Sequence, residues 1–280
     1  MSFVESDGLK GQELPKPSPL KQFFDSRIIS VVLYVIIVFV IAYGSFKGAQ
    51  SMGYNWQWYR VPQYLYSFTD DGFQWGEIMI GLTKTIKLSA TAFALATVLG
   101  LIVALMRLSG LVVGTAVAIG YLELIRNIPL LVLLYLFYYV LGPIFGFDRY
   151  SASVLCLAVF HSALISEIFR AGINAVAVGQ WEAAKSIGMS SGQTYRYIVL
   201  PQSVRFMLPP MTGELVHLIK SSAIVSVIAV AELTTIGRNI ISDTYMSFEI
   251  WFTIAAVYMV VTLILSVGVS YLEKRYAVDQ

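Results

Sequence analysis

Long apolar stretches separated by short polar segments dominate the hydrophobic pattern of this 280-residue chain. An α-helix needs about 20 apolar residues to cross a bilayer, and each stretch is close to that length or longer. The stretches are continuously apolar, carry Gly, Ser and Ala between larger side chains, and show no two-residue alternation. The pattern therefore predicts an all-α membrane protein with about six transmembrane helices. The predicted spans are 28–46, 78–106, 112–141, 151–172, 209–231 and 250–272.

Composition agrees with a chain that lies in lipid. Hydrophobic residues make up 57% and charged residues 13%, whereas a soluble domain is more polar. The net charge of +2 is too small to indicate nucleic acid as a partner. The single cysteine, Cys156, excludes a disulfide within the chain. The first stretch is long for a signal peptide and lacks a small-residue cleavage site, so we expect a retained span.

Lysine and arginine are distributed unequally between the segments that connect the spans. Cytoplasmic segments are enriched in these residues, and the asymmetry predicts that both termini are cytoplasmic. The predicted inside segments carry Lys10, Lys16, Lys21, Arg27, Arg107, Lys185, Arg196, Arg205, Lys274 and Arg275, and the outside segments carry Lys47, Arg60, Arg149 and Arg238.

Two segments flank the first span. Residues 1–27 mix charge with Pro and Gly and are expected to form a flexible cytoplasmic tail. Residues 47–77 are rich in Trp and Tyr, which is typical of a belt at the outer membrane interface, with a short helix lying on the membrane as one form. A docking surface for an external partner stays open for this aromatic segment.

One polar stretch, residues 178–205, lies between apolar spans and is predicted to be cytoplasmic. It begins with a short helix that Gly188 is expected to end, because glycine readily adopts the left-handed conformation. Ser190 and Gln193 have the spacing of a capping box, which predicts a second helix immediately afterwards. Pro201 is expected to end that helix. Two short helices joined by a glycine form a bracket suited to docking.

The same stretch carries a motif. Glu182, Ala183, Ala184, Gly188, Ile198, Leu200 and Pro201 resemble, at every spacing, the EAA signature of permease subunits of binding-protein-dependent ABC importers. The surrounding segments "YLELIRNIPLLVLLY", "SALISEIFRAGINAVAVGQWEAAKSIGM" and "LIKSSAIVSVIAVAEL" resemble the branch that imports polar amino acids. The similarity covers about residues 81–275.

The resemblance implies a five-helix, MetI-like permease core at 78–275, with an extra N-terminal transmembrane helix at 28–46. It implies that the EAA residues couple the permease to the ATPase, and that the complex contains two ATP-binding cassette subunits, a second permease subunit and an extracytoplasmic solute-binding protein. It places the chain in the cell (inner) membrane with an amino acid as cargo.

Catalytic groups are not predicted in this chain. It lacks the GxxxxGK[ST] sequence that cradles a triphosphate, so we expect ATP and Mg²⁺ to bind the partner ATPase subunits and no cofactor to bind here. His161 and His217 are the only two histidines, and they lie in different predicted spans without a nearby cysteine. No metal cluster is therefore predicted.

Ionisable residues within the predicted spans cost free energy unless they face protein or water. Glu123 with Arg126, and Glu167 with Arg170, have i,i+3 spacing, while Glu214, His217 and Lys220 form a stripe on one helix face. Mutual neutralisation is sufficient to explain these charges. The alternative is a substrate pathway, for which the candidates are Glu123, Arg126, Asn127, Glu214, His217 and Lys220.

Prolines refine this picture at two places. Pro129 removes the amide that would bond the carbonyl of Ile125, which makes the adjoining segment a candidate cavity wall. Pro209 and Pro210 suit the first turn of a helix, so the fifth span is expected to begin there. Lys220 would then lie near the membrane midplane. For Arg126 and Lys220 the sequence leaves open a cavity wall or a buried ion pair; for Glu167 and Arg170 it favours a structural pair.

Function is therefore predicted as ATP-driven import of a polar amino acid by alternating access. A permease of the same fold for another small solute, such as an opine or a compatible solute, is the first alternative. An ion-coupled carrier that works alone is the second, suggested by the carboxylates in the spans. A receptor or scaffold is a third, and the chain shows no signalling domain that would support it.

Overall fold

The computed structural model describes residues 27–69 and 72–276, which form two compact units divided between Trp56 and Gln57. The first unit contains α2, Arg27–Ser51, whose large apolar side chains are exposed along most of its length. Such exposure is expected of a helix that faces lipid. The predicted tail at 1–27 lies outside the described residues, apart from Arg27 at the start of α2.

The second unit contains the other helices and one hairpin. Four helices in the described residues of this unit are long and apolar enough to cross a membrane, and a bent helix pair forms a further broken span; with α2 the total is up to six, as predicted. The elements are η1 Trp58–Arg60, α3 Pro62–Leu65, β1 Tyr66–Thr69, β2 Gly72–Trp75, α4 Glu77–Leu108, α5 Val112–Asn127, α6 Leu130–Tyr135, η2 Leu136–Leu141, α7 Gly142–Phe145, α8 Arg149–Asn174, α9 Val178–Ser186, α10 Ser191–Thr194, η3 Tyr195–Val199, α11 Leu200–Ser221, η4 Ser222–Ile228, α12 Leu233–Thr244 and α13 Ser247–Tyr276.

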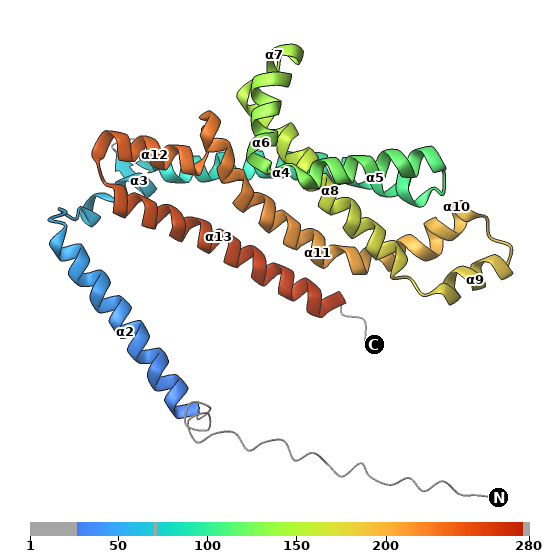
Figure 1. The fold of residues 1–280 in the computed structure, drawn as a ribbon, viewed down its shortest axis with the longest axis horizontal. Coiled ribbons are helices and arrows are strands. Elements are labelled where there is room, and N and C mark those ends of the chain that lie inside the picture. The colour runs from blue at the N-terminus through green and yellow to red at the C-terminus, as the bar shows by residue number, and fades with distance from the viewer. Residues whose placement is uncertain (1–26, 70–71, 277–280) are drawn as a thin grey trace, which may run out of the picture. The chain divides into compact units, whose positions relative to one another are not determined.

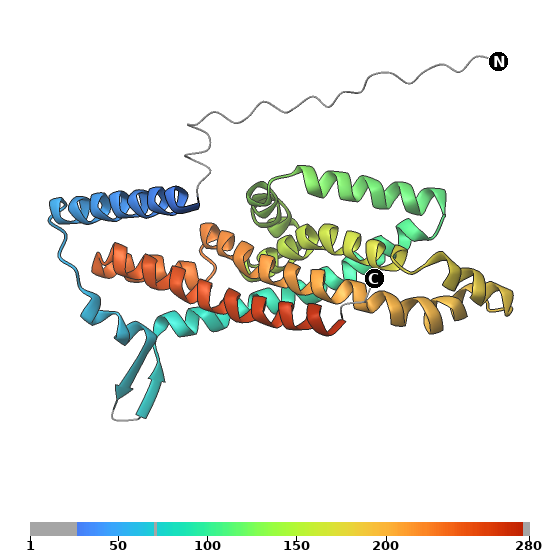
Figure 2. The same cartoon turned by 90° about the horizontal axis from the view of Figure 1, so that it is seen from below.

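Long helices of the second unit run along one common direction (Figures 1 and 2). Helices α4, α8, α11 and α13 form this bundle, and α5 doubles back beside it. The short helices α9 and α10 lie at one end of the bundle, and α3, α12 and the hairpin lie at the other. The polar bracket and the aromatic hairpin are thus separated by the full length of the long helices.

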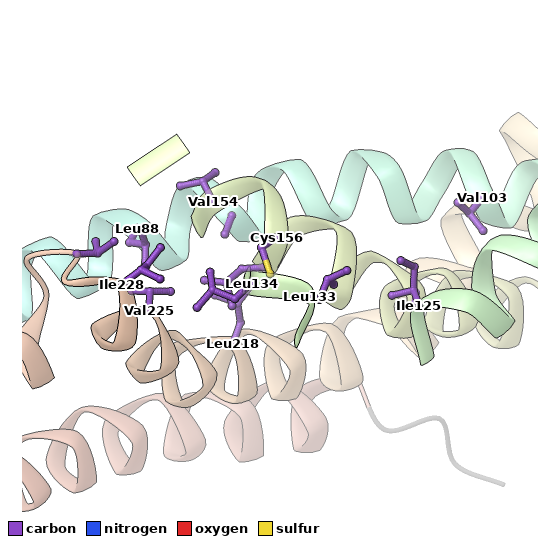
Figure 3. Close-up of a cluster of buried hydrophobic side chains, with 14 of the residues drawn as sticks. Leu88, Val103, Ile125, Leu133, Leu134, Val154, Cys156, Leu218, Val225 and Ile228 are labelled. Carbon is purple, nitrogen blue, oxygen red and sulfur yellow. The ribbon is translucent and has the colours of Figure 1, made fainter. Parts of the chain in front are cut away.

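Helices α4 and α8 share the most extensive contact in the fold. Ala92, Ala96, Gly100 and Ala104 recur every four residues along α4 and are buried, so they share one face of the helix. A Cβ placed on Gly100 would lie 2.7 Å from the side chain of Ile165. Small residues at this seam let the two backbones approach, which is how helices pack closely in lipid. The larger side chains of the adjoining core include Leu88, Leu134, Cys156 and Leu218 (Figure 3).

The third predicted span, 112–141, is not one continuous helix. Helix α5 ends at Asn127, Ile128 and Pro129 are extended, and the chain then bends by 104° between the two halves of the span. Proline disfavours the helical conformation of the residue before it and removes one backbone donor, which accounts for the position of the break. Pro129 was expected to remove one backbone hydrogen bond within a continuous span, and the structure corrects this continuity, because the span is broken at Pro129.

The start of the fifth span was predicted wrongly. Pro201 does not end a helix, and Pro209 and Pro210 lie inside α11 rather than in its first turn. Before Pro201 the chain forms a π-helical turn, in which the N–H of Leu200 bonds to Tyr195, and the side chain of Gln202 donates to the carbonyl of Ile198. The wider turn accommodates a residue that lacks an N–H. Lys220 consequently lies near the C-terminal end of α11, not midway along a helix that begins at Pro209.

The aromatic segment is more structured than the sequence indicated. After η1 and α3, strands β1 and β2 pair antiparallel with Tyr66 opposite Trp75. Edge-to-face contacts link Phe68 to Phe73 and Phe73 to Trp75. The backbone N–H of Gln57 donates to a carboxylate oxygen of the buried Glu249, 2.6 Å away on α13, so this segment is fixed to the bundle.

Candidate functional site

The bracket of α9 and α10 has the geometry that the sequence predicted. Helix α9 ends at Ser186, and Gly188 adopts the left-handed conformation with φ of +80°. The N–H of Met189 donates to the carbonyl of Ala184 over 3.1 Å, and the N–H of Gly188 donates to that of Lys185 over 3.0 Å. These two bonds form a Schellman motif, which requires a left-handed residue at the position of Gly188.

A capping box starts the second helix. The N–H of Ser190 donates to the side chain of Gln193 over 2.9 Å, and the Ser190 hydroxyl accepts the N–H of Gln193 over 3.4 Å. The helix continues through η3 into α11, so one polar cap sets the direction of a long membrane helix. Trp181 of α9 packs edge-to-face on Tyr195, with ring centroids 5.1 Å apart. Both halves of the bracket are therefore held in a defined relation to each other.

The predicted coupling residues divide into two groups. Ala184 is buried and Ile198 is half-buried; the others, Glu182, Ala183, Gly188, Leu200 and Pro201, are exposed. Large apolar side chains lie exposed beside them, with Ile187 76% and Tyr197 63% accessible. An exposed carboxylate among exposed apolar groups at the end of a bundle is a surface that a protein partner can cover.

Glu214 lies between two histidines. Its carboxylate is 2.5 Å from Nδ1 of His161 on α8 and 3.5 Å from Nδ1 of His217 on its own helix, α11. The side chain of His161 is fully buried, that of Glu214 is 11% exposed, and that of His217 is 53% exposed. The two histidines are 56 residues apart in the sequence, yet their ring centroids lie 5.3 Å apart. No metal cluster was predicted because the two histidines lie in different spans. In the folded chain, however, the packing of α8 against α11 brings their rings together.

The other residues of the predicted substrate pathway are exposed; they are Glu123, Arg126, Asn127 and Lys220. Lys220 is exposed and forms no ion pair with a described residue, so Glu214 and Lys220 do not neutralise each other directly. Glu123 and Arg126 are exposed and form no ion pair within the described part of the chain. Instead, the side-chain amide of Asn127 donates to the carbonyl and to the carboxylate of Glu123, over 2.7 and 3.3 Å.

The structural pair of Glu167 and Arg170 is confirmed. Arg170 donates two hydrogen bonds to Glu167, of 2.9 and 2.8 Å. Arg107, at the last turn of α4, also donates to Glu167 and ties α4 to α8. Sequence reasoning missed Arg107 because its partner lies 60 residues away.

A cavity at the end of the bundle that carries the hairpin was not predicted. It has a volume of about 500 Å³, within the usual range for a small-molecule site. Lys84 and Lys87 of α4 and Arg149 of α8 line it together with Asp148 and Glu232. The sequence feature that could have indicated this cavity is the pair Lys84 and Lys87, three residues apart near the start of an apolar helix.

Comparisons with known proteins identify the family. Residues 96–278 match the family described as "Binding-protein-dependent transport system inner membrane component". The probable glutamine ABC transporter permease protein GlnM of Bacillus subtilis (strain 168) is 38% identical over 199 residues, which cover 70% of this chain and 92% of that protein.

Two further likenesses extend the comparison. The arginine transport system permease protein ArgU of Corynebacterium glutamicum (strain ATCC 13032) is 33% identical over 263 residues, covering 88% of this chain and 79% of that protein. A solved structure described as an amino acid ABC transporter with histidines superposes with a TM-score of 0.67 at 42% identity, covering 71% of this chain and 94% of that one. The resemblance found in the EAA residues is confirmed, and this chain belongs to the family of binding-protein-dependent transport system inner membrane components.

Proposed function

We propose that this chain is the permease subunit of an ATP-driven importer that carries a polar amino acid into the cell by alternating access. The bracket carries this proposal: it presents Glu182 and neighbouring exposed apolar side chains at one end of the bundle, on a helix pair fixed by Gly188 and Ser190. Because the bracket continues directly into α11, a movement of the bracket also moves a membrane helix.

Partners follow from the same proposal. Two ATP-binding cassette subunits bind ATP and Mg²⁺ and dock on the bracket of each permease. A second permease subunit, identical or paralogous, completes the pathway, and an extracytoplasmic solute-binding protein delivers the amino acid. The chain is a multi-pass protein of the inner membrane with both termini in the cytoplasm, which places the hairpin outside.

An amino acid as cargo is supported by two kinds of observation. Permeases whose names specify glutamine are 38% and 33% identical to this chain, and permeases named for nopaline, octopine and arginine are each 33% identical. The cavity lined by Lys84, Lys87 and Arg149 brings these cations to one volume, where a cargo carboxylate would find cationic partners.

Reconstitution tests the proposal. The chain is purified with its genomic ATPase, second permease and binding protein, and uptake of labelled glutamine and arginine into proteoliposomes is measured with ATP inside. We expect uptake that requires both ATP and binding protein. The control complex carries an ATPase whose Walker A lysine is replaced. Uptake that persists in that complex, driven by an ion gradient, would establish the alternative of an ion-coupled carrier.

A further inference from the structure

A histidine, a carboxylate and a second histidine meet where α8 crosses α11. One ligand atom from each of His161, Glu214 and His217 lies within 4.8 Å of the other two. Zinc bonds to such atoms are about 2.0 Å long, so ligands in a tetrahedral site lie roughly 3.3 Å apart. Oε2 of Glu214 is 3.5 Å from Nδ1 of His217, close to this spacing, whereas Oε1 is 2.5 Å from Nδ1 of His161, a hydrogen-bond distance that an ion would lengthen.

The position of the carboxylate favours a bound cation. Glu214 lies in a membrane-spanning helix, its side chain is 11% exposed, and its ion-pair partners among the described residues are the two histidines. A carboxylate charge at such depth is costly, and a divalent ion held by the carboxylate offsets that cost.

We propose that His161, Glu214 and His217 form a binding site for a divalent transition-metal ion of the Zn²⁺ type. Two imidazole nitrogens and one carboxylate are a ligand set that zinc accepts with a fourth position open, whereas Mg²⁺ and Ca²⁺ prefer oxygen ligands. The ion reaches the site from the side of His217, whose side chain is 53% exposed, since His161 is fully buried. Because His161 belongs to α8 and the other two ligands to α11, the ion links two helices of the bundle.

The proposal is tested by metal binding to the full-length chain, purified in detergent with an affinity tag that contains no histidine. Co²⁺ is titrated while its visible absorption is recorded, and Zn²⁺ is then added in competition. We expect one saturable site per chain, with the intense bands of a four-coordinate Co²⁺ ion, displaced by Zn²⁺ and not by Mg²⁺. Absence of saturable binding, or equal competition by Mg²⁺, would overturn the proposal.

Variants identify the ligands. His217→Ala keeps the contact between His161 and Glu214 and removes an exposed side chain, so the fold should persist, and the affinity should fall at least about tenfold. Cys156→Ala removes the only thiol and is the matched control, in which affinity should stay unchanged. Wild-type affinity in His217→Ala, or loss of binding in Cys156→Ala, would show that the ion binds elsewhere. The readout is independent of transport, so its failure leaves the proposed function standing.

Discussion

The backbone N–H of Met189 donates to the carbonyl of Ala184, and this bond crosses the left-handed residue Gly188. A Cβ placed on Gly188 would meet no atom within 4 Å, so the requirement for glycine comes from its backbone conformation rather than from crowding. The turn between the two halves of the bracket therefore requires the left-handed backbone conformation of Gly188.

Gly188→Val should uncouple transport from ATP hydrolysis while the spans remain folded. Valine in a left-handed conformation costs about 1–3 kcal/mol, so the turn reorients and directs Glu182 away from the ATPase. In reconstituted complexes, uptake should fall much more than the ATPase activity measured without binding protein, or the ATPase subunit should be lost on purification.

The matched control for this change is Gly192→Val. Gly192 lies in α10 with ordinary helical geometry and open space around its Cβ position, so transport should change little. Normal uptake by Gly188→Val, with normal stimulation of ATP hydrolysis by loaded binding protein, would show that this dihedral angle is not needed for coupling.

Topology predicts opposite accessibility for the two ends of the bundle. Gln74 in the hairpin and Ser191 in the bracket are both exposed, and each can be replaced by cysteine in a Cys156→Ala background. In intact cells an impermeant thiol reagent should label position 74, while position 191 should react only after the membrane is opened. Labelling of position 191 from outside would reverse the proposed orientation.

Lys220→Met should reduce uptake without reducing the amount of protein in the membrane. Glu214 keeps both of its histidine contacts in this variant, so no charge loses an ion-pair partner. If Lys220 binds cargo, loss of a charged hydrogen bond worth about 1.5 kcal/mol or more should raise the KM for uptake by about tenfold. Lys47→Met, on α2, is the control for a lysine outside the bundle. Unchanged kinetics and unchanged abundance would remove Lys220 from the substrate pathway.

Glu232→Ala should destabilise the end of the bundle that carries α12. The carboxylate of Glu232 accepts the N–H groups of Thr234 and Thr235 over 2.9 and 2.7 Å and caps α12. Loss of such a cap costs about 0.5–2 kcal/mol, whereas Glu232→Gln retains an acceptor and should cost less. Thermal unfolding in detergent compares the two variants, and equal Tm values for both and the wild type would exclude a capping role.

Burial raises the pKa of Glu232 above its ordinary value of 4.5, although hydrogen bonds from Thr234, Thr235 and Tyr258 oppose the shift. A group whose pKa is raised by folding contributes fully to stability below its unfolded pKa and loses that contribution as pH rises through the folded pKa. This part of the stability should therefore decline as pH rises from about 4.5. Glu232→Gln has no proton to lose and should show a flatter dependence of Tm on pH across that range.

The sequence was sufficient to predict those features that depend on interactions between residues close together in the chain. The apolar stretches predicted up to six spans because a helix in lipid satisfies all of its backbone hydrogen bonds within itself. Gly188 and the capping box of Ser190 and Gln193 were predictable because their hydrogen bonds join residues no more than five positions apart. Pro129 broke the third span for the same local reason.

The same local rule predicted that Pro201 ends a helix and that Pro209 and Pro210 begin one, and both predictions were wrong. Helix α11 continues through all three because a π-turn precedes Pro201 and the helix is held by its neighbours, α8 and α13. A helix that packs against other helices tolerates prolines that would end an isolated one.

By itself, the sequence determined the number of spans, the bracket and, through the EAA residues, the family. Only the tertiary structure decided which ionisable side chains contact each other. Glu214 was expected to be balanced within its own helix, yet its shortest contact is with His161, 53 residues earlier, and Glu167 gains Arg107 from 60 residues away. The physical reason is that spacing along one helix defines which residues share a face, whereas the residue opposite that face depends on how helices far apart in the chain pack together.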